Sequence, residues 1–530
     1  MGARMRTRPL ATIVILILCV AFAAGWVTDA LLAHGRSPIE RARELARTGR
    51  VDAAEQAYLD LATQQPGDLQ LVVELVDNHV KLEHGSMLAP MMATGHGPRL
   101  AAPVDESRID AVVSAPALGA DGALLAGWWR HFAESDEDPI ERDRVTEAAD
   151  RRSPPAWANH LLGRALSEEG EGSGAAERFA REATFFDGRA EDASDACMFW
   201  IREGDRARLR SALDVPAFAR QVPAGIRFED ARDRHDWVGA ARWFFPMQYE
   251  HTTLSVLLLA ALSGLVWFVI CATIGRIGQR PGLRIPLYVA AFALGIASTY
   301  LTLAVAIVEE SVLHFTERGQ AFDVIYFVFG VGIREELAKA LLLLPLVPIV
   351  RRWGTRREAL ACGALVGLGF AAEENLGYFH LGLSVGLDRF LTANFLHLST
   401  TGLVAVAIDD TMRGTRETRE SWTQVVPLVV VTHGVYDFFL SSKSVETASF
   451  VSMFVFVLLA RRFADVIREL PGREGPLLRY FVVGLALVTG GSFVYATSIV
   501  GVGHAATAIV GGMLGVAIMA YVFGRELGSV

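Results

Sequence analysis

The sequence contains few charged residues, few cysteines and almost no lysine. Charged residues make up 21% of the 530 residues and hydrophobic residues 52%, and the mean hydropathy is +0.32. Soluble globular domains carry about 25% charged residues, so the composition excludes a single soluble domain, a disordered chain and a fibrous repeat. The four cysteines, Cys19, Cys197, Cys271 and Cys362, form no CxxC pattern and do not indicate a disulfide framework.

The charge is distributed unevenly along the chain. Residues 28–250 contain 39 acidic and 26 basic residues, a net charge of −13, whereas the whole chain carries −9. We therefore predict three parts: an N-terminal membrane anchor or signal peptide at 1–27, a soluble domain at 28–250 and a nine-span membrane domain at 251–530. No part has the basic face that nucleic-acid binding requires, so we predict no nucleic-acid partner.

The N-terminal segment has two interpretations. Three arginines precede an apolar run over residues 10–27, which favours an uncleaved anchor with its N-terminus in the cytoplasm. The stretch Ala21-Phe22-Ala23 resembles a signal-peptidase site, so a cleaved signal peptide is the alternative. Either interpretation delivers the acidic domain to the extracytoplasmic side.

Nine further apolar runs are long enough to cross a bilayer, which requires about 20 helical residues. They are 253–275, 286–308, 321–350, 358–380, 389–410, 422–441, 448–467, 478–500 and 504–524. Alternate loops between them are rich in arginine, for example at Arg351, Arg352, Arg356 and Arg357. If these loops are cytoplasmic, the acidic domain is outside. Together with the anchor we predict an all-α protein of about ten spans, with both termini in the cytoplasm.

The acidic domain has the pattern of short amphipathic helices. Gly49, Ala54, Tyr58 and Pro66 have a spacing that resembles the second half of a tetratricopeptide repeat, and a looser echo follows Trp157. A degenerate repeat array would bind a peptide or a protein partner. The alternative is a helical domain whose small residues only allow close packing. At its end, Trp237, Trp243 and Tyr249 precede the next span and are typical of a membrane interface.

Ionisable residues interrupt four of the membrane runs. A charge near the bilayer centre costs at least about 2.5 kcal/mol, so such residues usually face an internal cavity. Run 321–350 contains Glu335, Glu336 and Lys339, and Glu335 and Lys339 share a helical face. Gly330 and Gly332 precede them. We therefore expect a break or a re-entrant turn in this run, which is longer than one crossing needs.

The other three runs supply carboxylates, an amide and histidines. Run 358–380 contains Glu374 and Asn375, run 389–410 contains His397, and run 422–441 contains His433 and Asp437 on one helical face. Counted from the loops, these residues lie in the middle or outer part of the membrane. We expect them to meet Glu335 in one cavity that opens outward.

This set of side chains suits two hydrolytic chemistries. In the first, a carboxylate acts as general base on a water while histidine and Asp or Asn polarise a carbonyl group. In the second, histidines and glutamate hold a metal ion that activates the water. The spacing is not HExxH, so an ordinary zincin is excluded. Both chemistries predict hydrolysis of an amide within the membrane.

The ordered motifs resemble the PrsW family of intramembrane proteases, which is related to the CAAX-protease-like membrane proteins. The motifs are Glu335-Glu336-x-x-Lys339, Phe370-Ala371-x-x-Glu374-Asn375, His397 and His433-x-x-x-Asp437. In the related CAAX group the second motif ends in histidine, where this sequence has Glu374. The PrsW branch therefore fits better, and the resemblance covers approximately residues 285–445 within a motif core at 321–441.

The resemblance implies a role for each site residue. Glu335 or Glu336 would activate the water, while Glu374 and His397 would hold the water or a metal. His433 and Asp437 would complete the site or stabilise the oxyanion, and Lys339 and Asn375 would orient the carboxylates. Its metal would be a divalent ion such as zinc, held by His397, His433 and Glu374. A glutamate-dependent mechanism without metal stays open.

The resemblance further implies a substrate and a location. The substrate would be a membrane-anchored protein, for example an anti-sigma factor, cleaved near its extracytoplasmic face. The abundance of arginine indicates a GC-rich genome, so we expect the inner membrane of a bacterium. Two other functions use the same residues: an ion-coupled transporter, which predicts internal repeats among the spans, and a non-catalytic sensor or scaffold that binds partners through its helical repeats.

Overall fold

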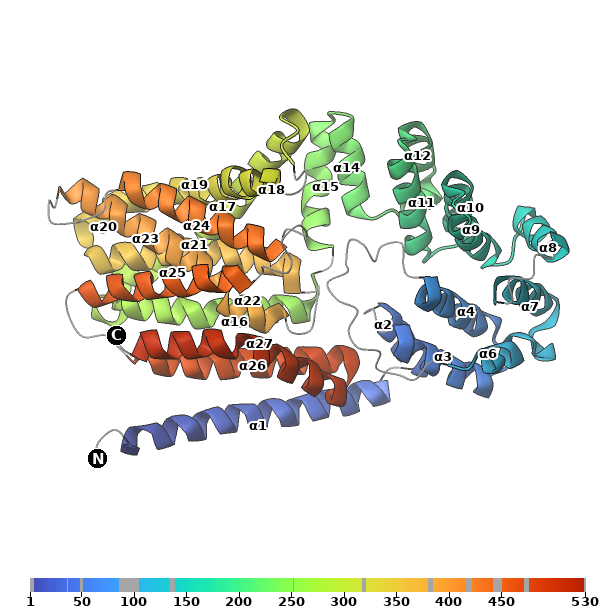
Figure 1. Ribbon diagram of the computed structural model, residues 1–530, viewed down its shortest axis with the longest axis horizontal. Coiled ribbons are helices and arrows are strands. Elements are labelled where there is room, and N and C mark those ends of the chain that lie inside the picture. Colours follow the sequence, from blue (N-terminus) through green and yellow to red (C-terminus); the bar gives the residue numbers. More distant parts are fainter. Residues whose placement is uncertain are drawn as a thin grey trace. The chain divides into compact units, whose positions relative to one another are not determined.

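The computed structural model describes residues 4–35, 37–47, 51–84, 104–133, 139–250, 252–316, 321–379, 385–414, 422–441, 450–470 and 476–528. Within these residues the regular structure is helical and contains no strand, so the all-α prediction is confirmed. The chain divides into two compact units (Figure 1). The membrane unit comprises Met1–Asp29 and His251–Val530, and the acidic unit comprises Ala30–Glu250.

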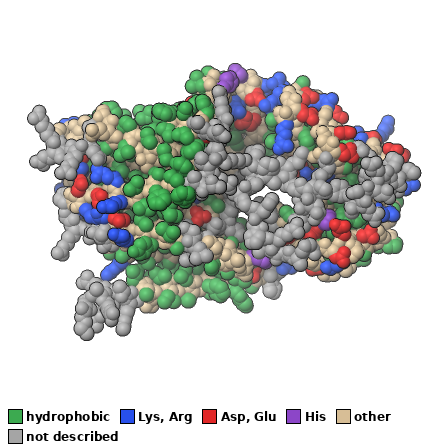
Figure 2. Space-filling model, viewed as in Figure 1, with side chains coloured by type: hydrophobic (Ala, Val, Ile, Leu, Met, Phe, Trp, Pro, Cys, Tyr) green, Lys and Arg blue, Asp and Glu red, His purple; other side chains and the backbone are tan. Residues whose placement is uncertain are grey.

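The acidic unit is a succession of short helices, each packed against the next. They are α2 (Pro38–Arg47), α3 (Val51–Gln64), α4 (Leu69–His84), α6 (Glu106–Val113), α7 (Gly119–Ala133), α8 (Pro139–Asp150), α9 (Ala158–Glu168), α10 (Gly172–Phe185), α11 (Ala190–Glu203), α12 (Arg206–Leu213), α13 (Pro216–Ala219), α14 (Ala224–Asp233) and α15 (Trp237–Tyr249). Charged side chains of both signs cover much of its visible surface (Figure 2).

Small residues allow these helices to approach closely. A Cβ at Gly163 would lie 2.8 Å from the Phe179 ring, which crosses from α10 onto α9. Ala54 and Tyr58 of α3 are also buried. Gly49 lies outside the described residues. Close helical packing is therefore present, whereas the tetratricopeptide-like repeat is not confirmed.

The membrane unit begins with α1 (Arg4–Gly35), which runs into the acidic unit at its end. Its other elements are α16 (Leu254–Ile274), η2 (Ile277–Gln279), α17 (Pro281–Val312), α18 (Ala321–Ile325), the π-helix η3 (Tyr326–Gly332), α19 (Ile333–Leu343), η4 (Leu344–Leu346), α20 (Val347–Trp353), α21 (Arg356–Tyr378), α22 (Val385–Leu391), α23 (Ala393–Arg413), α24 (Trp422–Ser441), α25 (Phe450–Glu469), α26 (Leu477–Val500) and α27 (Val502–Gly528).

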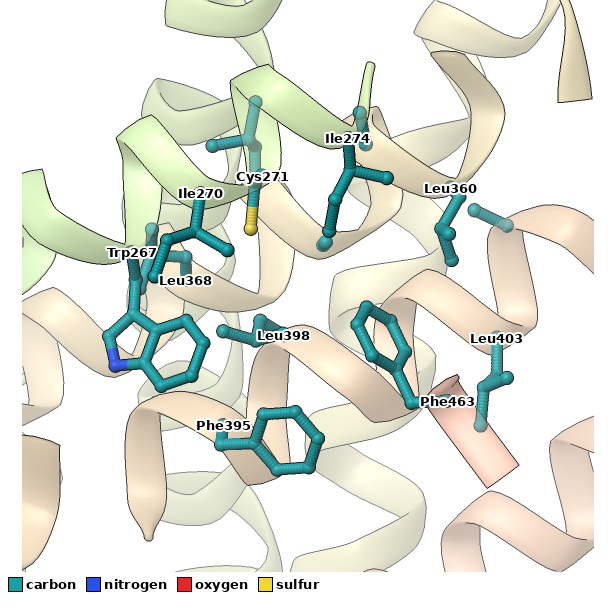
Figure 3. Close-up of a cluster of buried hydrophobic side chains, with 14 of the residues drawn as sticks. Trp267, Ile270, Cys271, Ile274, Leu360, Leu368, Phe395, Leu398, Leu403 and Phe463 are labelled. Atoms are coloured by element: carbon teal, nitrogen blue, oxygen red, sulfur yellow. The ribbon is translucent and has the colours of Figure 1, made fainter. Parts of the chain in front are cut away.

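Helices α21 and α23 form the centre of the membrane unit. Most side chains of both helices are buried, and other helices of the unit pack against them. Trp267 of α16 donates a hydrogen bond from its indole nitrogen to the Phe390 carbonyl oxygen at 2.7 Å. Its ring packs against Phe395 of α23 (Figure 3). This apolar core fixes the positions of the helices that carry the polar residues.

Seven helices among the described residues are long and apolar enough to cross a membrane. They are Leu10–Leu31, Leu254–Ile274, Pro281–Val312, Arg356–Tyr378, Val385–Arg413, Trp422–Ser441 and Leu477–Val500. A bent pair, Glu106–Val113 with Pro116–Arg130, would be an eighth, although it lies in the acidic unit. The membrane nature of the protein is thus supported, but the predicted total of about ten spans is not confirmed.

Three predicted spans are missing from these seven, two of them for a physical reason. Run 321–350 is divided by the π-helical turn of η3 and by η4, so it is no single continuous α-helix. The expected interruption lies at Gly330 and Gly332, inside η3. Run 448–467 corresponds to α25, whose last two turns carry several charges. Run 504–524 lies in the continuous helix α27, and its side chains at 512–516 are outside the described residues.

Candidate active site

Four helices bring the predicted residues together. Glu335, Glu336 and Lys339 come from α19, Glu374 and Asn375 from α21, His397 from α23, and His433 and Asp437 from α24. Glu374 and Asp437 each lie four residues before the end of their helix, and His397 lies four residues after its start. At 1.5 Å per residue, all three are about 6 Å from the same end of the bundle. Arg356 and Arg413 mark the opposite ends of α21 and α23.

Two glycines allow the site to close around α24. A Cβ at Gly332 would lie 2.6 Å from the Val430 carbonyl oxygen, and one at Gly434 would lie 2.4 Å from Val328 Cα. No side chain fits at either position, so the π-helix η3 and α24 pack backbone to backbone. Gly434 adjoins His433, and Gly332 immediately precedes α19. The close approach therefore brings His433 to the two glutamates.

Glu336 is a buried acceptor for several donors. Its Oε1 accepts hydrogen bonds from Lys339 Nζ at 2.6 Å and from Thr400 Oγ1 at 3.3 Å, and it lies 2.6 Å from His433 Nδ1. Its side chain is 1% exposed. A carboxylate that is occupied in this way has little capacity to act on a water molecule. Its geometry suits the orientation of Lys339 and His433.

Glu335 has a different environment from its neighbour. Its Oε2 is buried and has no hydrogen-bond partner in the described structure. The same oxygen lies 3.5 Å from His433 Nε2, 4.0 Å from His397 Nδ1 and 3.8 Å from Lys339 Nζ. A buried carboxylate oxygen without a donor is costly. Such an atom is the expected ligand of a metal ion or of a water molecule.

The contacts of His433 define which of its nitrogens is available. Glu336 accepts a hydrogen bond from His433 Nδ1, so that nitrogen carries a proton. The other ring nitrogen, Nε2, lies 3.5 Å from Glu335 Oε2 and 3.2 Å from Asp437 Oδ2. In metal sites, a carboxylate commonly fixes the tautomer of a ligating histidine through its other nitrogen. The Glu336–His433 pair has this arrangement.

His397 is oriented from the opposite side. Its Nε2 lies 3.1 Å from Glu374 Oε2, which also accepts a hydrogen bond from Arg389 Nη2 at 2.6 Å. With the proton on Nε2, Nδ1 is the acceptor, and Lys339 Nζ lies 3.0 Å from it. The ring centroids of His397 and His433 are 5.0 Å apart. Both histidines therefore direct a ring nitrogen toward the region of Glu335.

Ligand atoms of Glu335, His397 and His433 all lie within 4.8 Å of one another, the spacing of a candidate metal site. The donors fit a divalent ion such as zinc, which binds imidazole nitrogen and carboxylate oxygen. The oxygen of Glu335 without a partner supports the fit. The predicted third ligand was Glu374, which instead contacts His397 and Arg389. Lys339 would have to release His397 for the histidine to bind.

Exposure indicates where the site opens. The side chains of Lys339, Glu336 and His433 are at most 1% exposed. Those of Asp437 and Glu374 are 22% and 25% exposed. The accessible side of the cluster is therefore the side of Glu374 and Asp437, near the helix ends described above.

Sequence reasoning missed the residues that support this cluster. Arg389 binds Glu374 and also donates from Nε to Asn375 Oδ1 at 2.6 Å, so this arginine links Asn375 to the cluster. Asn375 in turn donates to Asn394 Oδ1 at 2.8 Å. Tyr300 donates to Glu373 at 2.8 Å. Arg389 and Asn394 are polar residues in or beside an apolar run, which is the signal that could have revealed them.

Comparison with known proteins supports the resemblance. Residues 284–460 match the family described as PrsW family intramembrane metalloprotease. The protein "Protease PrsW" of Clostridioides difficile (strain 630) is 26% identical over 149 residues, which are 27% of this chain and 63% of that relative. The chain thus covers less than two thirds of that relative's length. No solved structure matches the chain. The resemblance predicted from the four motifs is confirmed: residues 284–460, which contain every residue of the site, are similar to an intramembrane metalloprotease family.

Proposed function

We propose that this protein is an intramembrane peptidase that hydrolyses a peptide bond of a membrane-anchored protein. One observation carries the proposal. Within a helical membrane unit, Glu335 Oε2 lacks a hydrogen-bond donor and faces two histidines whose other nitrogens are held by carboxylates. A site with an open acceptor and accessible neighbouring carboxylates can bind and activate water.

In the metal-dependent form of the reaction, Glu335, His397 and His433 would hold the ion. A divalent ion such as zinc, when bound, would polarise the scissile carbonyl and acidify a water molecule. Glu336 keeps the proton on His433 Nδ1, and Glu374 keeps it on His397 Nε2. The exposed carboxylate of Asp437 would then accept the proton of the water.

In the glutamate-dependent form, Glu335 itself is the general base. Its Oε2 takes a proton from water while the water oxygen bonds to the carbonyl carbon. The proton then passes to the amide nitrogen as the C–N bond breaks, which yields a carboxylate and an amine. His433, as an imidazolium whose charge Glu336 and Asp437 balance, would donate a hydrogen bond from Nε2 to the oxyanion. Lys339 lies 3.8 Å from Glu335 Oε2 and balances its charge.

We also propose the predicted topology. About ten spans, both termini in the cytoplasm and an extracytoplasmic acidic domain place the arginine ends of α21 and α23 inside the cell. The cluster near the other ends then lies toward the outer face of the inner membrane. Cleavage would occur near the extracytoplasmic side of the substrate, for example an anti-sigma factor. The acidic domain would bind the substrate or another protein partner.

Comparison of cleavage products in membranes tests the proposal. Wild type, Glu335→Gln and His433→Ala are expressed at equal levels, and new N-termini of single-pass membrane proteins are identified by mass spectrometry with and without a chelator. Glu526→Gln, a carboxylate that pairs with Arg468 outside the site, is the matched control. We expect products only with wild type and control. Loss on chelation supports the metal form, and resistance supports the glutamate form.

Identical products from all four proteins would contradict a peptidase. If a phenotype of the deleted gene persisted under those conditions, a sensor or scaffold would be the better account. Proton- or cation-dependent solute uptake abolished by Glu335→Gln would instead indicate a transporter.

A further inference from the structure

The last helix of the acidic unit, α15 (Trp237–Tyr249), has two dissimilar faces. One face packs against α14. There Ala240 is buried, Phe244 contacts Phe228 with ring centroids 6.2 Å apart, and the Arg227 guanidinium lies 4.5 Å from the centroid of the Trp243 ring. These contacts fix the rotation of α15 about its own axis within the α14–α15 hairpin. The residues on its other side are therefore presented outward.

The outward face of α15 is mostly apolar, with Gln248 as a polar residue near its end. Trp237 is 47% exposed, Val238 83% and Phe245 54%. At 100° per residue, these three residues and the exposed Ala241 fall within one third of the helix circumference. Arg242 lies at the edge of this stripe. Single exposed apolar residues need no explanation, but a continuous stripe that includes a tryptophan indicates an apolar partner.

The covalent structure limits what this partner can be. Tyr249 ends α15 and Leu254 begins α16, so five residue steps join them. At about 3.6 Å per residue, the two helix ends are within about 18 Å of each other. The 21 residues of α16 span about 31 Å, the thickness of the hydrocarbon core, so its first residue lies at the bilayer surface. The Tyr249 end of α15 is thus tethered near a lipid surface.

We propose that α15 is an interfacial helix whose Trp237–Val238–Ala241–Phe245 stripe inserts into the boundary between lipid headgroups and acyl chains. Tryptophan suits this depth, and Arg242 at the edge of the stripe is placed to meet lipid phosphates. The inserted helix would hold the α14–α15 hairpin on the membrane surface. This inference depends on the membrane location of α16 and not on the proposed peptidase activity.

Photo-crosslinking to lipid tests the inference. A benzophenone amino acid is placed at position 238 or 245 of the full-length protein, which is reconstituted as single copies in nanodiscs of phosphatidylcholine and phosphatidylglycerol. Val215 is the matched control because it is apolar and 40% exposed on another helix start of the same unit. We expect lipid adducts, measured by intact mass, about fivefold or more above the control at both positions.

A second variant separates insertion from chance contact. With benzophenone at position 241, the double substitution Trp237→Ser and Phe245→Ser should reduce the lipid adducts severalfold without changing expression. Adduct yields at 238 and 245 equal to that at 215 would overturn the proposal. A further test uses discs that hold two copies of the protein. Crosslinks from these positions to the second copy instead of to lipid would also overturn the proposal.

Discussion

Two buried histidines, one in each unit, show how similar residues serve different purposes. In the acidic unit, His160 lies between Asp192 at 2.6 Å and Asp77 at 2.7 Å, so both ring nitrogens are occupied. In the membrane unit, His433 has one short contact, with Glu336, and its Nε2 faces Asp437 and Glu335 at longer distances. We call His160 with Asp77 and Asp192 the closed cluster. We call His433 with Glu335, Glu336 and Asp437 the open cluster.

The charge of the His160 ring shows that the closed cluster has no free acceptor nitrogen. Burial lowers the pKa of His160, but Asp192 and Asp77 together raise it to about 10. The ring is therefore a cation at neutral pH, without a lone pair for a metal ion. Its role is to join α4, α9 and α11. The open cluster offers acceptor atoms and an accessible side, which are the two properties that a site for chemistry requires.

An oxygen without a donor is not sufficient by itself. Both carboxylate oxygens of Glu182 in α10 are buried without a hydrogen-bond partner, and Arg189 Nε lies 3.4 Å from one of them. However, the Glu182 side chain is 0% exposed, whereas Glu335 adjoins the accessible Glu374 and Asp437. Access distinguishes a candidate catalytic carboxylate from a strained structural one.

The largest expected effect tests this distinction directly. Glu335→Gln should reduce cleavage by about 10²–10⁴-fold because it removes the base or ligand oxygen, while Glu182→Gln should leave cleavage within about twofold, the ordinary scatter for a residue outside the site. Rates are measured with the same membrane substrate, and folding is checked by size-exclusion chromatography. Equal losses in both variants would remove the basis for separating the clusters.

Arg389 should have the next largest effect because it holds Glu374, which orients His397. Arg389→Ala should weaken zinc binding by about 10–100-fold, the range seen when the support of a ligating histidine is removed. Zinc affinity is measured by competition with a chelating dye. The control is Arg413→Ala, which breaks an ion pair with Asp409 at the other end of α23. An affinity that responds equally to both variants would exclude a specific role for Arg389.

A smaller effect is expected from the backbone contact that forms the open cluster. In Gly434→Ala the new Cβ would overlap Val328, so α24 must shift away from η3. We expect a stability loss of about 1–3 kcal/mol and slower cleavage, measured by thermal unfolding and product formation. Gly377→Ala is the control because a Cβ there has no neighbour within 4 Å. A stable, fully active Gly434→Ala would show that this close contact is dispensable.

The smallest effect concerns the pH dependence of the acidic unit. Burial raises the pKa of Glu182 to about 7 and that of Asp195 to about 6. The folded state therefore binds more protons than the unfolded state between about pH 4 and 7, and stability falls as the pH rises through this range. The raised pKa of His160 has the same sign at higher pH.

We expect the acidic unit to be about 1–3 kcal/mol more stable at pH 5 than at pH 8. Glu182→Gln should remove a large part of this difference. The measurement is resistance of the full-length protein to proteolysis at increasing temperature, with cleavage sites assigned to the acidic unit. A difference of the opposite sign would mean that Glu182 is charged and well solvated.

The all-α class and most residues of the candidate site could be predicted from the sequence. The length of an apolar run and an ionisable residue inside it are both visible in a short stretch of sequence. The division of run 321–350 could not be predicted in detail, since it depends on the contact of Gly332 with α24. The sequence also could not distinguish Glu335 from Glu336. Their difference arises from Lys339, Thr400 and His433, which approach Glu336 from three helices.

The π-helix η3 makes the site sensitive to chain length as well as to residue identity. A π-helical turn holds one more residue than an α-helical turn. Deletion of one residue within Tyr326–Gly332 could restore regular α-helix, but it would rotate the preceding segment by about 100° relative to α19. Val328 could then no longer pack against Gly434 while Glu335 and Glu336 kept their positions. The number of residues in this segment therefore sets the direction in which each side chain points. A deletion would change these directions more than most point substitutions would.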